Sequence, residues 1–212
     1  MSTTNGFITL EGIEGVGKST NLAYLEQLIV AAGHEVVVTR EPGGTPLGEQ
    51  IRRWVLDEEH GNVSAEVETM LMFAARAQHL DDVIRPALDR GAWVLCDRFT
   101  DATIPYQGGG RGVSLEWITT LKNAVQRDLE PDLTLLFDAP IEVGFGRIAD
   151  REPDHFERED RAFFERVRAT YLSQADRYPD RVKRVDAAQS LDDVKGAIRK
   201  HLETLLLVYR SA

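Results

Sequence analysis

The stretch GIEGVGKST, Gly12–Thr20, decides the fold, because it fits the pattern G-x-x-x-x-G-K-[ST] that cradles phosphate groups. An apolar run at 7–10 precedes it and a helical pattern follows it, which is the strand–loop–helix context that the motif requires. We expect Lys18 to reach the β- and γ-phosphates of a nucleotide and the Ser19 hydroxyl to join a Mg²⁺ shell. The residues expected around the nucleotide are Gly12, Ile13, Glu14, Gly15, Val16, Gly17, Lys18, Ser19 and Thr20.

The rest of the chain alternates short apolar runs with longer helical patterns. Runs that are apolar on both faces are typical of a parallel sheet covered by helices, and the alternation predicts an α/β fold. The apolar runs lie at 7–10, 36–38, 93–96, 133–137 and 182–185. The helical patterns cover 19–32, 47–56, 65–90, 115–126, 141–149, 161–178 and 191–208. Two segments fit neither pattern: glycine-rich 106–112 predicts a flexible loop, and charge-dense 150–160 predicts a mobile surface segment.

Composition and charge narrow the class of protein. A chain of 212 residues favours one domain. Its formal charge of -10 argues against broad binding of nucleic acids, while it still permits a local positively charged pocket. The one cysteine, Cys96, permits no internal disulfide, so the reducing cytosol is the expected compartment. No apolar run approaches the ~20 residues that span a bilayer, and MSTTNGFITLEG at the start lacks the basic residues of a signal peptide. The sequence therefore predicts a cytoplasmic protein that does not bind membranes.

A second anion site is expected beside the first. Arg40 and Arg52 flank a Pro-Gly-Gly turn after the second strand, near the sheet edge where α/β proteins bind ligands. In the helical stretch MFAARAQH, Phe73 and Arg76 are three residues apart and share a face, which suits a base that carries a phosphate. A phenylalanine taken alone, as Phe73 could be, is more often a core residue. The next strand ends in Asp97 and Arg98, a pair that can also be structural. Thr103, Tyr106, Gln107 and Arg111 follow it.

Together these motifs resemble the bacterial thymidylate kinase family. GIEGVGKST, TREPGGT, FAARAQH, DRF followed by YQGGGRG, and PDLTLLFD occur in that family's order and spacing, along nearly the whole chain. The resemblance implies a phosphotransferase of the P-loop nucleoside monophosphate kinase type, with a five-stranded parallel sheet and helices on both faces. It also implies transfer of the ATP γ-phosphoryl group to dTMP, giving dTDP and ADP within dTTP biosynthesis, a requirement for Mg²⁺, and a homodimer.

The resemblance also assigns roles residue by residue. Lys18, Glu14, Arg98 and a lid arginine would be catalytic, with Glu14 acting near the acceptor sugar and Asp97 near Mg²⁺. Arg52, Arg76 and Arg98 would clamp the acceptor phosphate, and Phe73 would stack on thymine. Thr103 and Gln107 would contact the base and sugar, and Tyr106 would disfavour a 2′-hydroxyl.

The family has one form with an arginine in the phosphate loop and another with an arginine in a closing lid. Here the loop offers Glu14 and no arginine, so the lid form matches, with the lid at about 147–160. Arg151 is the expected catalytic lid arginine and Arg147 an expected ATP contact, although a solvated charge run is the alternative for both. The family's lid commonly has D-R-F-E, whereas this chain has His155 in the arginine position, with Arg158 nearby.

Two other classes of function stay open. A kinase for another nucleoside monophosphate would share the phosphate clamps and differ only around the base. A P-loop ATPase or switch protein is less consistent with the sequence, because the guanine-reading pattern N-K-x-D is absent and a switch needs no second anion site.

Overall fold

A parallel sheet organises the chain. The computed structural model describes residues 5–56, 63–149 and 154–211, which form the strands β1 (Phe7–Glu11), β2 (Val36–Arg40), β3 (Trp93–Asp97), β4 (Leu133–Asp138) and β5 (Val182–Asp186). All strand pairs in these ranges are parallel, in the order β2-β3-β1-β4-β5. The order reverses beside β1, so the loops after β1 and β3 lie where α/β sheets bind ligands.

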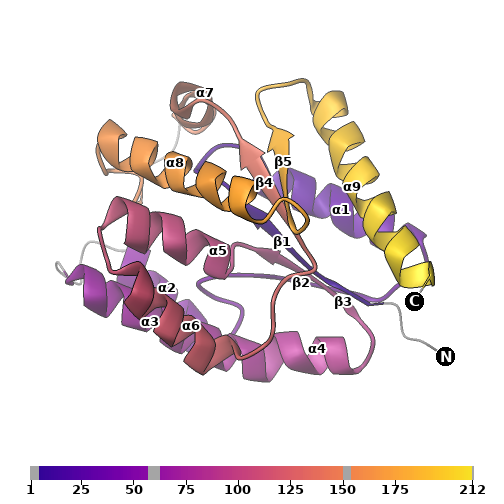
Figure 1. Cartoon of the computed structure of the whole chain (residues 1–212), viewed down its shortest axis with the longest axis horizontal. Helices are drawn as coiled ribbons and strands as arrows, with labels where there is room; N and C mark the ends of the chain where they lie inside the picture. The colour runs from indigo at the N-terminus through magenta and orange to yellow at the C-terminus, as the bar shows by residue number, and fades with distance from the viewer. Residues whose placement is uncertain (1–4, 57–62, 150–153, 212) are drawn as a thin grey trace.

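Helices cover both faces of the sheet, as predicted. Figure 1 shows α1 and α9 on one face, and α3, α4, α6 and α8 on the other. The helical elements are α1 (Lys18–Ala31), α2 (Pro46–Leu56), α3 (Ala65–His79), α4 (Arg85–Asp89), α5 (Thr100–Thr103), α6 (Leu115–Gln126), α7 (Ile141–Gly146), α8 (Arg161–Arg177), α9 (Leu191–Ser211) and the π-helical turns η2 (Leu80–Ile84) and η3 (Ile104–Gly110).

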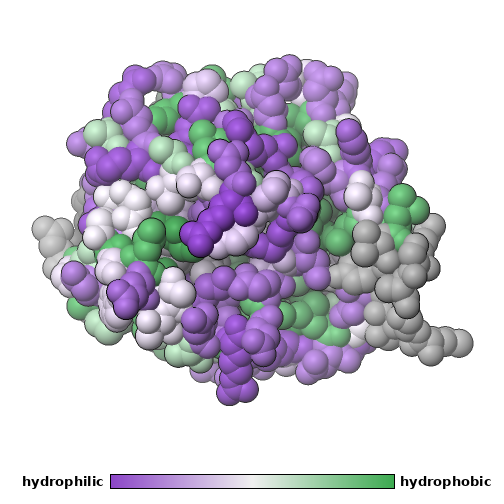
Figure 2. All heavy atoms as spheres, viewed as in Figure 1, coloured by the Kyte–Doolittle hydropathy of each residue, from purple (hydrophilic) through white to green (hydrophobic). Residues whose placement is uncertain are grey.

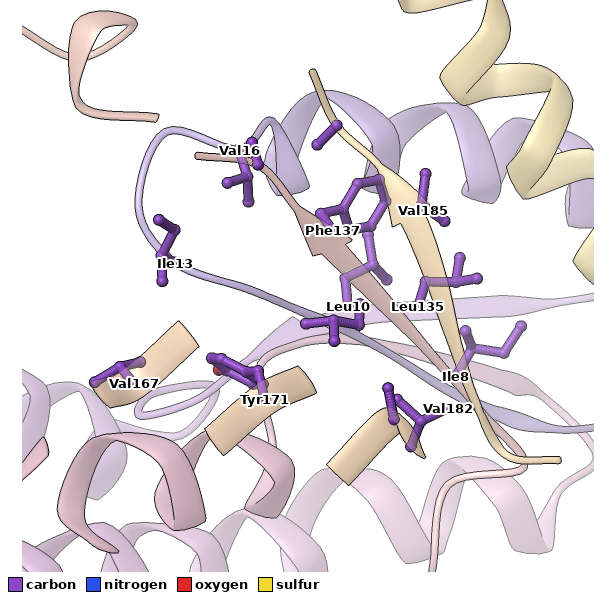
Figure 3. Close-up of a cluster of buried hydrophobic side chains, with 14 of the residues drawn as sticks. Ile8, Leu10, Ile13, Val16, Leu135, Phe137, Val167, Tyr171, Val182 and Val185 are labelled. Carbon is purple, nitrogen blue, oxygen red and sulfur yellow. The ribbon is translucent and has the colours of Figure 1, made fainter. Parts of the chain in front are cut away.

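The core forms because the central strands are apolar on both faces. β1 is buried at every position, and β3 and β4 are buried up to their last residue. Figure 3 shows Val167 and Tyr171 of α8 on one side of these strands and Phe137 and Val185 on the other. Each fully buried side chain of this size contributes about 1.5–3 kcal/mol of transfer free energy, so the strands that carry the site are firmly held.

The surface is mainly polar. Figure 2 shows hydrophilic side chains over most of one face, with apolar side chains in small separate patches. Among the described residues, no helix combines the length and the apolar character needed to cross a membrane.

Three expectations about local structure differ from the structure. The glycine-rich segment 106–112 is largely the turn η3, packed against α8, instead of a flexible loop. A Cβ atom at Gly110 would lie 2.3 Å from the Phe163 ring, so glycine here permits close packing. The single helix expected at 65–90 is interrupted by η2. In the segment 150–160, residues 150–153 lie outside the described ranges, while Phe156 and Glu157 are buried instead of lying on the surface.

Candidate active site

The phosphate loop connects β1 to α1. Its glycines at 12, 15 and 17 all have positive φ, and Lys18 begins the helix. The Lys18 ammonium is buried and donates to the carbonyl oxygens of Gly12 at 3.0 Å and Ile13 at 2.7 Å. Burial, followed by the nearby positive charge of Arg98, lowers the Lys18 pKa from 10.5 to about 8. The ammonium group lies beside the backbone amides of the loop although its burial is unfavourable, and a positive charge at this place is suited to binding phosphate oxygens.

The end of β3 places Arg98 over the same loop. Arg98 has φ of 69°, and its Nη2 donates to Glu14 Oε1 at 2.8 Å. The Tyr106 hydroxyl donates to the same carboxylate oxygen at 2.7 Å, and the guanidinium lies 4.7 Å from the Tyr106 ring centroid. Glu14 Oε2 and Asp97 Oδ1 are buried and have no hydrogen-bond partner among the described residues. Buried oxygens of this kind are normally satisfied, so both indicate where a ligand or ion binds.

A buried carboxyl group supports this turn from behind. Glu11 Oε1 accepts from the Phe99 backbone nitrogen at 2.7 Å, and Glu11 Oε2 accepts from the Tyr171 hydroxyl at 2.8 Å. Arg98 Nη1 in turn donates to the Tyr171 oxygen at 3.3 Å. Burial, and then the charge of Asp101, raise the Glu11 pKa from 4.5 to about 8. Glu11 thereby ties β1, the β3 turn and α8 together.

A second arginine approaches from α3. Arg76 is buried, its Nε donates to Glu41 Oε2 at 2.7 Å, and its Nη2 donates to Thr103 Oγ1 at 3.1 Å. Its remaining nitrogen, Nη1, is buried and has no hydrogen-bond partner in the part of the chain that the structure describes. Arg52 of α2 lies nearby and donates to the Pro42 carbonyl oxygen at 3.1 Å. Gln107 is held by its amide nitrogen, which donates to Glu68 Oε1 at 2.9 Å.

One cavity of about 510 Å³ joins these groups. Each predicted residue that lines this cavity either has a polar or charged side chain or belongs to the phosphate loop. They are Glu14, Gly15, Gly17, Lys18, Ser19, Thr20, Arg52, Arg76, Asp97, Arg98, Thr103, Tyr106, Gln107 and Arg147. The structure thus brings both expected anion sites to the same cavity.

Other predicted residues lie apart from the cavity lining. Arg40 is exposed and pairs with Glu49 at 2.9 Å. Phe73 is buried in a cluster with Val113 and Ile118, and its ring centroid lies 4.8 Å from the Arg76 guanidinium carbon. Gly12, Ile13 and Val16 are buried in the loop behind the lining. Arg151 lies outside the described residues.

The segment that follows residue 153 closes one side of the cavity. The backbone nitrogens of Asp154 and Glu157 donate to each other's carboxylates at 3.1 and 3.0 Å, which shapes a tight turn. Phe156 lines the cavity and contacts the Tyr106 ring edge to face, with centroids 5.7 Å apart. His155 Nε2 lies 3.2 Å from a nitrogen of Arg111, which also forms an ion pair with Glu159. Arg147 lines the cavity and donates to the Ala187 carbonyl oxygen at 2.9 Å.

Several residues of the site were not predicted. Glu41, Met72 and Phe156 line the cavity, and Tyr171 and Glu11 hold Arg98 in place. No local pattern marks Tyr171, because its partner Glu11 is 160 positions away in the chain. Glu41 stands inside the quoted motif TREPGGT, directly after Arg40, and this position was the available signal.

The fold and the cavity together define the class: a P-loop protein with a nucleoside monophosphate kinase-like α/β fold, in which the phosphate loop shares one cavity with Arg52, Arg76 and Arg98. Residues 10–198 match the family model described as thymidylate kinase. A thymidylate kinase of Pseudomonas syringae pv. tomato is 58% identical over 208 residues, which cover 98% of this chain and 99% of the relative. One from Pseudomonas putida strain GB-1 is 57% identical over 201 residues, or 94% of each chain.

A solved structure agrees with these relatives. The crystal structure of thymidylate kinase from Ehrlichia chaffeensis matches with a TM-score of 0.77 and 32% identity, over 94% of this chain and 98% of that one. This chain belongs to the thymidylate kinase family.

Proposed function

We propose that this chain transfers the γ-phosphoryl group of ATP to dTMP, giving dTDP and ADP for dTTP synthesis. The observation that carries the proposal is the shared cavity, in which Lys18 of the phosphate loop and the three arginines Arg52, Arg76 and Arg98 converge. Phosphoryl transfer needs little covalent chemistry from a protein, because positioning and charge stabilisation provide most of the rate acceleration.

The donor half of the cavity holds ATP. Backbone amides of the loop 12–20 bind the phosphates, and Lys18 neutralises charge on the β- and γ-phosphoryl oxygens. Arg147, held by the Ala187 carbonyl oxygen, contacts ATP at the opposite wall. Thr20 lies at the first turn of α1 and contributes to the same phosphates.

The acceptor half holds dTMP. Arg52, Arg76 and Arg98, which line the cavity together, clamp the acceptor phosphate. Thr103 and Gln107 contact the base and sugar, while the Tyr106 ring closes the pocket at the deoxyribose and disfavours a 2′-hydroxyl. Glu14 presents an unpaired carboxylate oxygen to the acceptor sugar. Arg40 and Phe73 support this half from outside the lining, Arg40 through Glu49 and Phe73 beneath the Arg76 guanidinium.

The residues present fit a Mg²⁺ ion. Asp97 Oδ1 is buried and has no hydrogen-bond partner within residues 5–56, 63–149 and 154–211, and Ser19 lines the same cavity. Mg²⁺ commonly takes one or two carboxylates plus substrate phosphates. Ser19 and Asp97 would hold the ion, which when bound neutralises charge on the transferring phosphates.

The lid, about 147–160 of a single domain, closes over the donor. Arg151 supplies the positive charge that stabilises the transferring phosphoryl group, since the phosphate loop has no arginine. Phe156 in the described part of this segment contacts the Tyr106 ring and lines the cavity, which supports a place for the lid beside the bound nucleotides.

The chain also works as a cytoplasmic homodimer. Its one cysteine is buried and free, consistent with a reducing compartment. Exposed apolar side chains on α2 and α3, among them Trp54, Val67 and Met70, offer a surface for a second copy. Light scattering during size-exclusion chromatography tests this, and a mass near that of one chain would contradict it.

The decisive experiment measures ADP release with ATP and Mg²⁺ against dTMP, dUMP, UMP, CMP, AMP and GMP. We expect the highest kcat/KM with dTMP. A higher kcat/KM with another monophosphate would identify a different acceptor, and ADP release that needs no monophosphate would indicate an ATPase.

A further inference from the structure

A buried carboxylate lies behind one of the residues expected to contact the acceptor base. Glu68, in the first turn of α3, is 2% exposed, and its Oε1 accepts a hydrogen bond from Gln107 Nε2 at 2.9 Å. Gln107 and Thr103 are four residues apart on helical turns, and both line the cavity. Glu68 can therefore act on a bound nucleotide through Gln107.

The negative charge of Glu68 has a cation beside it. Arg111 Nη2 lies 3.4 Å from Glu68 Oε2, and Arg111 also forms an ion pair with Glu159. The guanidinium carbon of Arg111 lies 5.4 and 5.1 Å from the ring centroids of Phe156 and Phe163, so its position is fixed by packing. Buried charges are normally paired in this way, and both oxygens of a carboxylate can only accept hydrogen bonds.

This carboxylate determines which end of the Gln107 amide faces it. A side-chain amide has a donor end, the nitrogen, and an acceptor end, the oxygen. Because Glu68 only accepts, the reverse orientation of the amide would place two acceptor oxygens against each other. The main chain is held as well, since the Gln107 carbonyl oxygen accepts from the Val113 backbone nitrogen at 2.9 Å. The amide therefore cannot exchange its two ends without losing a buried hydrogen bond.

The amide oxygen of Gln107 is left for a ligand. Within the described part of the chain no group donates a hydrogen bond to Gln107 Oε1, and this oxygen is not among the fully enclosed ones that lack a partner. Although Gln107 is mostly buried, it lines the cavity, so Oε1 presents a hydrogen-bond acceptor there. Thymine and uracil carry a hydrogen on N3 that can bond such an oxygen, whereas N3 of cytosine has a lone pair that would repel it.

We propose that Glu68 is a positioning residue that sets the base specificity of the acceptor site: by holding the amide nitrogen of Gln107, it turns the amide oxygen toward the base and so favours thymine and uracil over cytosine. The inference deepens the proposed function and rests on it, because there Gln107 contacts dTMP. A site built to accept a hydrogen bond rejects a base that lacks the hydrogen, since the oxygen then stays unpaired.

One substitution removes the constraint without changing the shape of the side chain. Glu68→Gln replaces the carboxylate by an amide that can both donate and accept, so Gln107 can face it with either end. The matched control is Glu159→Gln, which makes the same exchange at the other carboxylate paired with Arg111 and leaves the hydrogen bond between Glu68 and Gln107 in place.

The measurement is titration calorimetry with dTMP, dUMP and dCMP, with weak binders measured by competition against dTMP. For Glu68→Gln, we expect the ratio of the Kd for dCMP to the Kd for dTMP to fall about tenfold, equivalent to about 1.4 kcal/mol. The ratio for dUMP and dTMP should stay within about twofold of the wild type, because both bases carry a hydrogen on N3. Glu159→Gln should leave both ratios within about twofold.

Two results with these variants would overturn the inference. An unchanged ratio for dCMP and dTMP in Glu68→Gln, including an equal weakening of all three nucleotides, would show that Glu68 only supports the fold. A fall of the same size in Glu159→Gln would assign the effect to the pairing of Arg111 instead.

The wild type provides a second measurement if Glu68→Gln does not fold. It should bind dCMP, and dTMP methylated at N3, at least about tenfold more weakly than dTMP, and equal binding of either probe would contradict an acceptor oxygen at this place. A wild type that does not bind dTMP, or releases no ADP with it, contradicts the proposed function. Selective binding of dTMP with an unchanged ratio in Glu68→Gln contradicts the inference alone, so the two failures are distinguishable.

Discussion

Replacing Lys18 by Met should stabilise the folded chain while abolishing its activity. Met keeps the unbranched apolar stem and removes the ammonium group, which is buried against the carbonyl oxygens of Gly12 and Ile13. Lys18→Met should lower kcat by at least ~10²-fold, since groups that stabilise transition-state charge commonly contribute that much.

The expected gain in stability follows from the Lys18 pKa. That pKa falls from 10.5 in the open chain to about 8 in the folded one. One pKa unit corresponds to about 1.4 kcal/mol, so the buried charge costs the folded state about 3 kcal/mol at neutral pH. Losing two hydrogen bonds removes roughly 1–2 kcal/mol. The net gain of about 1–2 kcal/mol should raise Tm by about 2–8 °C for a chain of this length.

Thermal unfolding in EDTA without nucleotide, recorded from pH 6 to pH 10.5, measures this effect. Between pH 8 and pH 10.5 the unfolded wild type binds more protons than the folded one, so wild-type stability should rise with pH in that window. The variant lacks this rise, and its advantage should shrink above pH 8. A variant that unfolds at lower temperature than the wild type at pH 7, or that retains near-normal turnover, would refute the reasoning.

Three other substitutions test separate parts of the site. Glu11→Gln keeps the shape of the Glu11 carboxyl group, whose pKa is raised to about 8 in the folded chain. Between about pH 4.5 and pH 8 the folded wild type retains this proton and the unfolded chain loses it, so wild-type stability should fall over this range relative to the variant. Parallel curves of Tm against pH for the two proteins would contradict this. Phe73→Ala should lower the free energy of unfolding, measured with denaturant, by about 3–5 kcal/mol. In calorimetry it should weaken the binding of dTMP but not of ATP, whereas equal weakening of both would show that Phe73 has only a packing role. Arg151→Ala should reduce kcat about 10³-fold with little change in dTMP affinity, and an unchanged kcat would transfer the role to Arg147 or Arg158.

The sequence predicts those parts of the site whose geometry is local. Lys18 and Ser19 follow the glycines of the loop directly, and Asp97 and Arg98 end an apolar strand, so spacing alone puts them at the same sheet edge. The strand and helix pattern also follows from local apolar periodicity, with shifts of a few residues at most ends.

The sequence does not predict contacts between distant segments. His79 meets Glu41 across 38 positions, and this pairing depends on how α3 packs against the turn after β2. The same applies to segment 106–112, where composition alone indicates flexibility. Only the position of Phe163 on α8 shows that glycine is required there for close packing.

Under the proposed function, the ion pairs of Arg76 and Arg98 explain how a chain with a formal charge of -10 can hold a phosphate. Buried arginines without an ion-pair partner would destabilise the folded chain, because burying an unpaired charge is strongly unfavourable. Glu41 and Glu14 remove most of that cost by pairing with Arg76 and Arg98 at 2.7 and 2.8 Å. Under the proposed function, affinity for the acceptor phosphate therefore depends on these carboxylates as well as on the arginines themselves.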